Sequence, residues 1–141
     1  MRIMGIDYGT KRIGVAISAP LTGLAHPLET VPLSPDGGHF KRLRDIAAEY
    51  EVSRIVVGLP YNIDGSLGPS AEKAQEMGRQ IGEALNLPVE FWDERLTTAE
   101  AHSLMTDFNV NSKKRRQVVD KIAASLILQA YLDAHPYEEK L

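Results

Sequence analysis

The feature that most limits the possible folds is an apolar run in the middle of the chain, IVVGLP at residues 55–60. An uninterrupted apolar run that stops at Gly-Leu-Pro is typical of a strand covered on both faces. Such strands belong to parallel sheets with helices packed on either side. The run therefore predicts an α/β protein in which this strand is central.

The segments on either side alternate between strand-like and helix-like patterns. Strands are expected at residues 2–8, 13–18, 26–33 and 88–94. Helices are expected at residues 39–51, from an N-cap at Ser70 to about Asn86, from a capping box at Thr97 through Phe108, and from about Arg115 to Ala134. The order is βββαβαβα with the last helical part split. It predicts a mixed sheet in which a three-stranded antiparallel meander is joined by two parallel strands.

Length and composition favour one domain over residues 1–141. A chain of 141 residues buries roughly 70% of its unfolded surface as a single domain, and no linker or repeat divides it. The absence of cysteine excludes a disulfide framework and a thiolate metal site. The first residues contain no apolar stretch long enough for a signal peptide or a spanning helix. We therefore expect a cytoplasmic protein without a membrane segment.

Three acidic positions lie in places that are costly for a carboxylate. Asp7 lies in an otherwise apolar strand, Asp93-Glu94 closes a later strand, and Asp120 shares a helix face with alanine, isoleucine and tyrosine residues that point toward the sheet. Inward-facing acids repel one another, and a divalent cation with oxygen ligands is the usual remedy. Taken alone, Asp7 also fits a structural aspartate bonded to the backbone of the turn at Gly9-Thr10.

Four blocks of the sequence resemble a known family, in order and over nearly the whole chain. They are GIDYGTKRIGVA, IVVGLPYNIDGS, WDERLTTAEA and VVDKIAASLIL. The element order resembles the ribonuclease H-like fold, and the blocks are similar to the YqgF family of Holliday-junction resolvases and nucleases of small-subunit ribosomal RNA precursors. By position, the resemblance implies Asp7, Glu94 and Asp120 as the catalytic and metal-binding acids.

The resemblance also implies an activity. It is a Mg²⁺- or Mn²⁺-dependent nuclease that processes the 5′ end of pre-16S rRNA and leaves 5′-phosphate and 3′-hydroxyl ends. One or two ions would activate water for in-line attack. Many ribonuclease H-like nucleases carry an acid on the strand beside the first, and RIVVGLP has none. Either Glu94 or Asp64 would replace it; we favour Glu94, because a strand end positions a ligand better than an Asp-Gly turn does.

Basic and polar residues near these acids are candidates for binding the nucleic-acid backbone. They are Thr10, Lys11, Arg95, Lys113, Lys114, Arg115 and Arg116. Each also has a simpler interpretation, as a turn residue, a surface ion pair or a solvated helix start. The run at 113–116 places cations at a helix N-terminus, which is locally unfavourable. That cost suggests a bound polyanion, and we expect the link at residues 109–114 to be mobile until substrate orders it.

Other functions compete with this one. The same fold and acids fit a resolvase that cuts four-way DNA, for which paired cuts would favour a two-fold dimer. They also fit a non-catalytic nucleic-acid-binding factor of the ribosomal small subunit. GIDYGT further resembles the phosphate-binding hairpin of actin-like ATPases, but those enzymes close two domains around their nucleotide and this chain has length for one. An RNA precursor is the favoured partner, and the oligomeric state is left open.

Overall fold

The computed structural model of the protein describes residues 2–20, 22–96 and 112–135, with only the backbone described at 96 and 112–118. Its elements are β1 (Arg2–Tyr8), β2 (Arg12–Ser18), β3 (Ala25–Pro32), α1 (Gly38–Glu49), β4 (Val52–Leu59), α2 (Pro69–Leu85), β5 (Val89–Asp93), a 3-10 turn η1 (Glu94–Leu96) and α4 (Ser112–Ala134). The helix expected from Thr97 through Phe108 lies outside the described residues.

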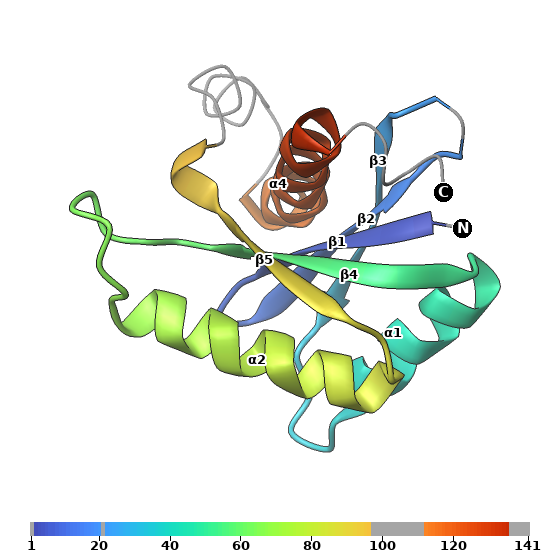
Figure 1. The fold of residues 1–141 in the computed structure, drawn as a ribbon. Helices are drawn as coiled ribbons and strands as arrows, with labels where there is room; N and C mark the ends of the chain where they lie inside the picture. The colour runs from blue at the N-terminus through green and yellow to red at the C-terminus, as the bar shows by residue number, and fades with distance from the viewer. Residues whose placement is uncertain (1, 21, 97–111, 136–141) are drawn as a thin grey trace.

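The five strands form one mixed sheet in the order β3-β2-β1-β4-β5. β2 pairs antiparallel with both β1 and β3, whereas β4 pairs parallel with both β1 and β5. This arrangement confirms the predicted meander with two added parallel strands. Figure 1 shows α4 lying across one face of the sheet, with α1 and α2 together on the other.

Two apolar cores result, one on each face of the sheet. Alternate residues of β4 enter different cores, because successive side chains of a strand point to opposite faces. Ile55 and Val57 pack with residues of α1 and α2, while Val56 packs with Ala124 and Ile127 of α4. The strand that contains this apolar run is therefore covered on both faces, as predicted. It is not the middle strand, however, because β1 takes that place and β4 lies between β1 and β5.

Two predicted helix boundaries are wrong, and both errors have a physical cause. The N-cap of α2 is Gly68 rather than Ser70, and Pro69 takes the first helical position, where its fixed φ and missing N–H are tolerated. α4 begins at Ser112 rather than near Arg115. Apolar periodicity starts only at Val118, but lysine and arginine are good helix formers and extend the helix backward.

Within residues 2–20, 22–96 and 112–135, no helix combines the length and the apolar character that crossing a membrane demands.

Candidate active site at the carboxyl ends of the strands

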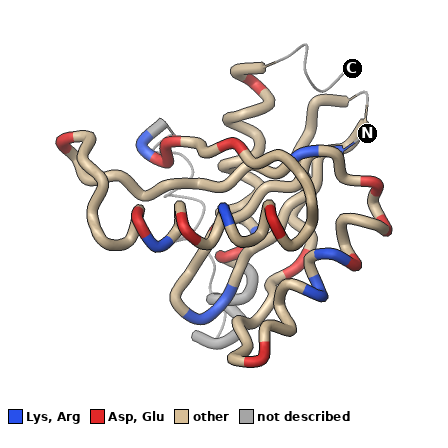
Figure 2. The backbone as a smooth tube through the Cα atoms, turned by 60° about the horizontal axis from the view of Figure 1, so that its bottom comes forward, with Lys and Arg blue, Asp and Glu red and all other residues tan. Residues whose placement is uncertain are grey.

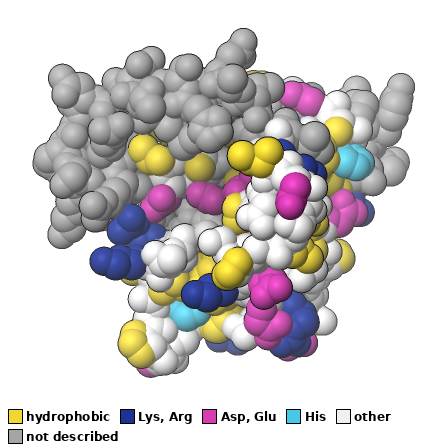
Figure 3. Space-filling model, turned by 90° about the vertical axis from the view of Figure 1, so that its left-hand side faces the viewer, with side chains coloured by type: hydrophobic (Ala, Val, Ile, Leu, Met, Phe, Trp, Pro, Cys, Tyr) yellow, Lys and Arg dark blue, Asp and Glu magenta, His cyan; other side chains and the backbone are white. Residues whose placement is uncertain are grey.

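The parallel strands bring several acidic residues to one edge of the sheet. β1, β4 and β5 run in the same direction, so their carboxyl ends share that edge. Asp7 is the second-last residue of β1, and Glu94 directly follows β5. In Figure 3, which faces the left-hand side of Figure 1, acidic side chains form a row in the middle of this face and basic side chains lie beside them.

Asp7 stands between two glycines of the neighbouring strands. It pairs with Gly14 of β2, and on its other side Ile6 pairs with Val57, which places Gly58 beside it. A Cβ at Gly14 would overlap the backbone oxygen of Asp120, so α4 can approach the sheet here only over a glycine. The two missing side chains leave the Asp7 carboxyl group room on the α4 face of the sheet.

Glu94 fills the space above Gly58 and meets Asp7. A Cβ at Gly58 would lie 2.8 Å from Glu94 Oε1 and 3.0 Å from Glu94 Cγ. The two carboxyl groups lie close enough that the charge of Glu94 and a side-chain hydrogen bond with it both raise the pKa of Asp7. The strand end therefore delivers the Glu94 carboxyl group to Asp7.

Several causes raise the pKa of Asp7 well above its ordinary value. The largest is withdrawal of its carboxyl group from water, although the residue as a whole is only half-buried. The charge of Glu94, the hydrogen bond to Glu94 and the charge of Asp120 raise it further. Strongly shifted carboxyl groups at the edge of a fold are typical of functional sites, where desolvation and like charges are tolerated for chemistry.

Asp120 reaches the same region from α4 but has a different partner. Arg12 Nε donates to Asp120 Oδ2 at 2.6 Å, and the two residues lie 108 positions apart in the chain. Asp120 therefore points toward the sheet, as predicted. Its pairing with Arg12 was not predicted; the only sequence signal was a second basic residue beside Lys11 in the turn.

The oxygen donors of this site suit Mg²⁺ or Mn²⁺ in kind. The closeness of Asp7 to Glu94 marks a place where a cation would relieve repulsion between two carboxylates. Within the part of the chain that the structure describes, however, no three histidine, cysteine, aspartate or glutamate side chains are placed to hold one ion together. Two acids adjoin, and the third, Asp120, is engaged by Arg12.

The predicted phosphate-binding residues are distributed around these acids. Thr10 and Lys11 are exposed in the β1–β2 turn, which is closed by a hydrogen bond from Gly9 N to Arg12 O at 2.8 Å. Arg95 forms an ion pair with Asp93 through Nη2, at 2.7 Å, and it also donates to Ile63 O at 3.3 Å. The Arg95 side chain therefore interacts with other residues of the protein, whereas the side chains of Thr10 and Lys11 are exposed to water.

The remaining candidates are a basic run and an alternative acid. Lys113 and Lys114, which were expected in a link, lie together with Arg115 and Arg116 in the first turns of α4. The side chains of these four residues, and the rest of the expected link at residues 109–111, are outside the described part of the structure. Asp64 is engaged in its own turn, where Oδ1 accepts hydrogen bonds from Ser66 N at 2.9 Å and Ser66 Oγ at 2.6 Å. That geometry is the one expected of an Asp-Gly turn.

Sequence comparisons give a consistent group of relatives. Residues 1–134 match the family described as "RuvX: Holliday junction resolvase". A Clostridium botulinum protein named "Putative pre-16S rRNA nuclease" is 50% identical over 133 residues, covering 94% of this chain and 97% of that protein. A protein of the same name from Pelotomaculum thermopropionicum is 47% identical over 135 residues, covering 95% and 88%.

Comparison of folds points the same way. The structure of T. thermophilus RuvC in complex with Holliday junction substrate matches with a TM-score of 0.61 at 17% identity, over 96% of each chain. The complex of fowlpox virus resolvase with Holliday junction DNA matches with a TM-score of 0.56 at 10% identity, over 96% of this chain and 99% of that one. At these identities the likeness concerns the fold, which is of the ribonuclease H-like type.

Proposed function

The chain belongs to the RuvX family, which is also called YqgF. We propose that it is a metal-dependent nuclease that processes pre-16S rRNA in the cytoplasm. The observation that carries the proposal is the meeting of Asp7 and Glu94 at the carboxyl ends of β1 and β5, with Asp120 beside them. Three acids on one edge of a sheet disfavour a polyanion unless a cation is bound as well. A surface that only bound RNA would be better without them.

The proposed chemistry follows from what each residue offers. Asp7, Glu94 and Asp120 would hold Mg²⁺ or Mn²⁺, which would activate a water molecule and stabilise the leaving oxygen of a phosphodiester. Because the raised pKa of Asp7 favours its protonated form, and a metal ligand has to be deprotonated, loading with metal would release a proton. Thr10 and Lys11 project from the turn that follows Asp7, where they would bind a phosphate of the substrate.

Hydrolysis of single-stranded RNA tests the assignment. With Mn²⁺ or Mg²⁺ present, wild type should cleave and the Asp7→Asn variant should lose activity by about a hundredfold or more, which is the scale of losing an electrostatic catalyst. Asp64→Asn is the matched control, because Asp64 is bonded within its own turn, and it should remain active. Equal rates for wild type and Asp7→Asn would refute the catalytic role of the acids.

A second candidate substrate is a four-way DNA junction, which the description of the matching family names. Phosphate contacts position a substrate without identifying it, so the two substrates need separate assays. Cleavage of a synthetic junction should be compared with cleavage of a pre-16S rRNA fragment. In the host, depletion of the protein should cause precursors with extended 5′ ends to accumulate, and mature ends in depleted cells would count against the RNA role.

A further inference from the structure

Arg12 is held firmly at the edge of the candidate site. It is the first residue of β2, and its carbonyl accepts a hydrogen bond from Gly9 N. Because Gly14 pairs with Asp7 and side chains of a strand alternate in direction, Arg12 projects from the same face of the sheet as Gly14. Its guanidinium group therefore starts from a fixed backbone on the α4 side.

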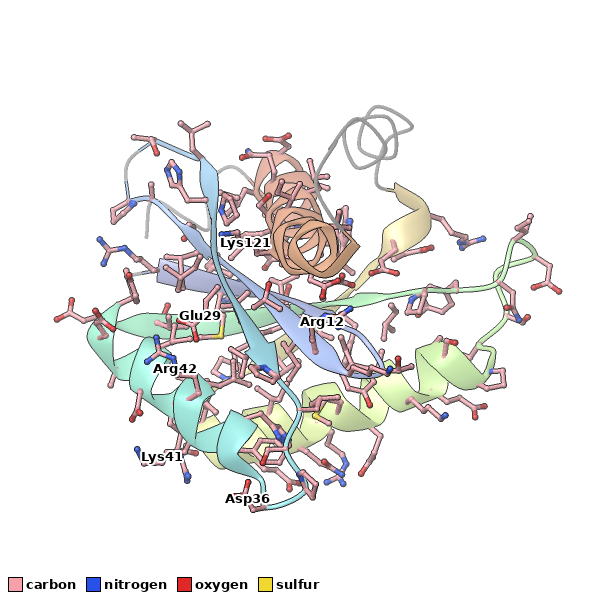
Figure 4. The ribbon with its side chains drawn as sticks, turned by 180° about the vertical axis from the view of Figure 1, so that it is seen from behind. Arg12, Glu29, Asp36, Lys41, Arg42 and Lys121 are labelled. Carbon is pink, nitrogen blue, oxygen red and sulfur yellow. The ribbon has the colours of Figure 1, made fainter. Side chains whose placement is uncertain are left out.

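The contact with Asp120 is sheltered and specific. The two side chains are 28% and 22% exposed, so the pair is less screened by water than a surface ion pair. The backbone of α4 rests on Gly14 at Asp120 itself, which limits where the carboxylate can lie. Figure 4 shows Arg12 on β2 beside α4. The acid is thus directed toward the guanidinium group by packing as well as by charge.

The same contact bears on the metal. Asp120 is one of three acids that a divalent cation would use, and its Oδ2 is bonded to Arg12 Nε. A cation that binds this oxygen has to displace the guanidinium group or share the oxygen with it. Both groups bind the same lone pairs and both are positively charged, so they repel each other. Before the metal arrives, Arg12 offsets the charge of Asp120, which is one of the charges that act on Asp7.

We propose that Arg12 is a positioning residue that holds Asp120 in the metal-free protein and competes with the divalent cation for its carboxylate. The inference rests on the proposed function, because it takes Asp7, Glu94 and Asp120 as the metal ligands. It assigns Arg12 a dual effect, in which the residue stabilises the empty site and lowers metal affinity. Metal binding is thereby kept weaker than the three acids alone would make it.

Calorimetric titration with Mn²⁺, together with thermal unfolding in EDTA and in Mn²⁺, tests the inference. The Arg12→Ala variant should bind Mn²⁺ about tenfold more tightly than wild type, since a like charge next to a ligand has been removed. In EDTA, its melting temperature should be lower than that of wild type. Addition of Mn²⁺ should raise its melting temperature by more than it raises that of wild type. Arg12→Lys, which keeps the charge, should return the Mn²⁺ affinity toward the wild-type value.

Controls separate this inference from the proposed function. Arg42→Ala removes an equal charge from the remote ion pair with Glu29, and it should leave Mn²⁺ affinity unchanged. If Asp7→Asn lowers Mn²⁺ affinity but Arg12→Ala leaves it equal or weaker, the competition is refuted while the metal site stands. If wild type and Asp7→Asn bind Mn²⁺ equally, the metal site of the proposed function fails, and this inference fails with it.

Discussion

Asp7 weakens the metal-free fold, and the sign of its effect follows from its raised pKa. The folded protein keeps a proton on this carboxyl group at pH values where the unfolded chain has already released it. The free energy of unfolding therefore falls as pH rises from the unfolded pKa to the folded pKa, by about 1.4 kcal/mol per pH unit for one proton. Above the folded pKa the full cost remains.

We predict that Asp7→Asn raises the melting temperature in EDTA at neutral pH and flattens the decline of stability above about pH 4. The amide keeps the shape of the side chain without the charge. Thermal unfolding in a pH series measures both effects. Asp45→Asn, at an exposed position of α1, is the control and should give no such gain. A lower melting temperature for Asp7→Asn would show that the ionised carboxylate stabilises the fold.

Gly58 determines whether Glu94 can reach its place. In a Gly58→Ala variant, the new Cβ would lie 2.6 Å from Ile127 Cδ1 and 2.8 Å from Glu94 Oε1, so both neighbours must move. We expect a loss of about 1–3 kcal/mol in stability together with loss of Mn²⁺ affinity and nuclease activity. Gly78→Ala is the control, because its new Cβ would lie 2.6 Å from Phe91 Cε1 and far from the acids. This variant should keep both its Mn²⁺ affinity and its nuclease activity. Full nuclease activity in Gly58→Ala would contradict the placement of Glu94 in the site.

At the scale of elements, Arg95 joins the loop after β4 to the end of β5. It pairs with Asp93, donates to Ile63 O and lies over the Tyr61 ring, 5.6 Å from its centroid. The loop otherwise bonds mostly within itself, through Asn62 and Ser66. One side chain therefore links two segments that flank the candidate site.

We predict that Arg95→Ala leaves the sheet intact but loosens residues 60–68. Amide hydrogen exchange in this loop should become faster, because its link to β5 is lost, while exchange in β1 and β4 should not change. Arg79→Ala, which removes ion pairs within α2, serves as the control. Unchanged exchange in the loop would mean that its own hydrogen bonds hold it, and would leave Arg95 free to contact substrate.

The elements could be predicted from the sequence because their signals are local. The strands were found from apolar runs, and Asn86 ends α2 in the left-handed conformation that suits asparagine at a helix end. The acids Asp7 and Asp120 were found because each is polar on an apolar face. The Arg12–Asp120 pair was not, since it joins residues 108 positions apart and depends on how closely α4 packs over Gly14.

At the scale of the whole molecule, the distribution of charge matters more than its sum. The formal net charge is −3, from 16 basic and 19 acidic residues, which does not favour indiscriminate nucleic-acid binding. Figure 2 shows acidic and basic residues interspersed along α1 and α2, so that layer offers no continuous basic field. The densest basic segment is residues 113–116, in the first turns of α4 and upstream of Asp120.

We predict that replacing Lys113, Lys114, Arg115 and Arg116 by alanine weakens RNA binding and flattens its salt dependence, because fewer counterions are released in the complex. Titrations of single-stranded RNA at several salt concentrations give the slope. The matched control replaces Lys41, Arg44, Lys73 and Arg79, four exposed residues of α1 and α2, and so changes the net charge equally. If the two variants bind with the same affinity and slope, net charge rather than a phosphate track explains the effect. If binding in the first variant equals that of wild type, the run is only a solvated helix start.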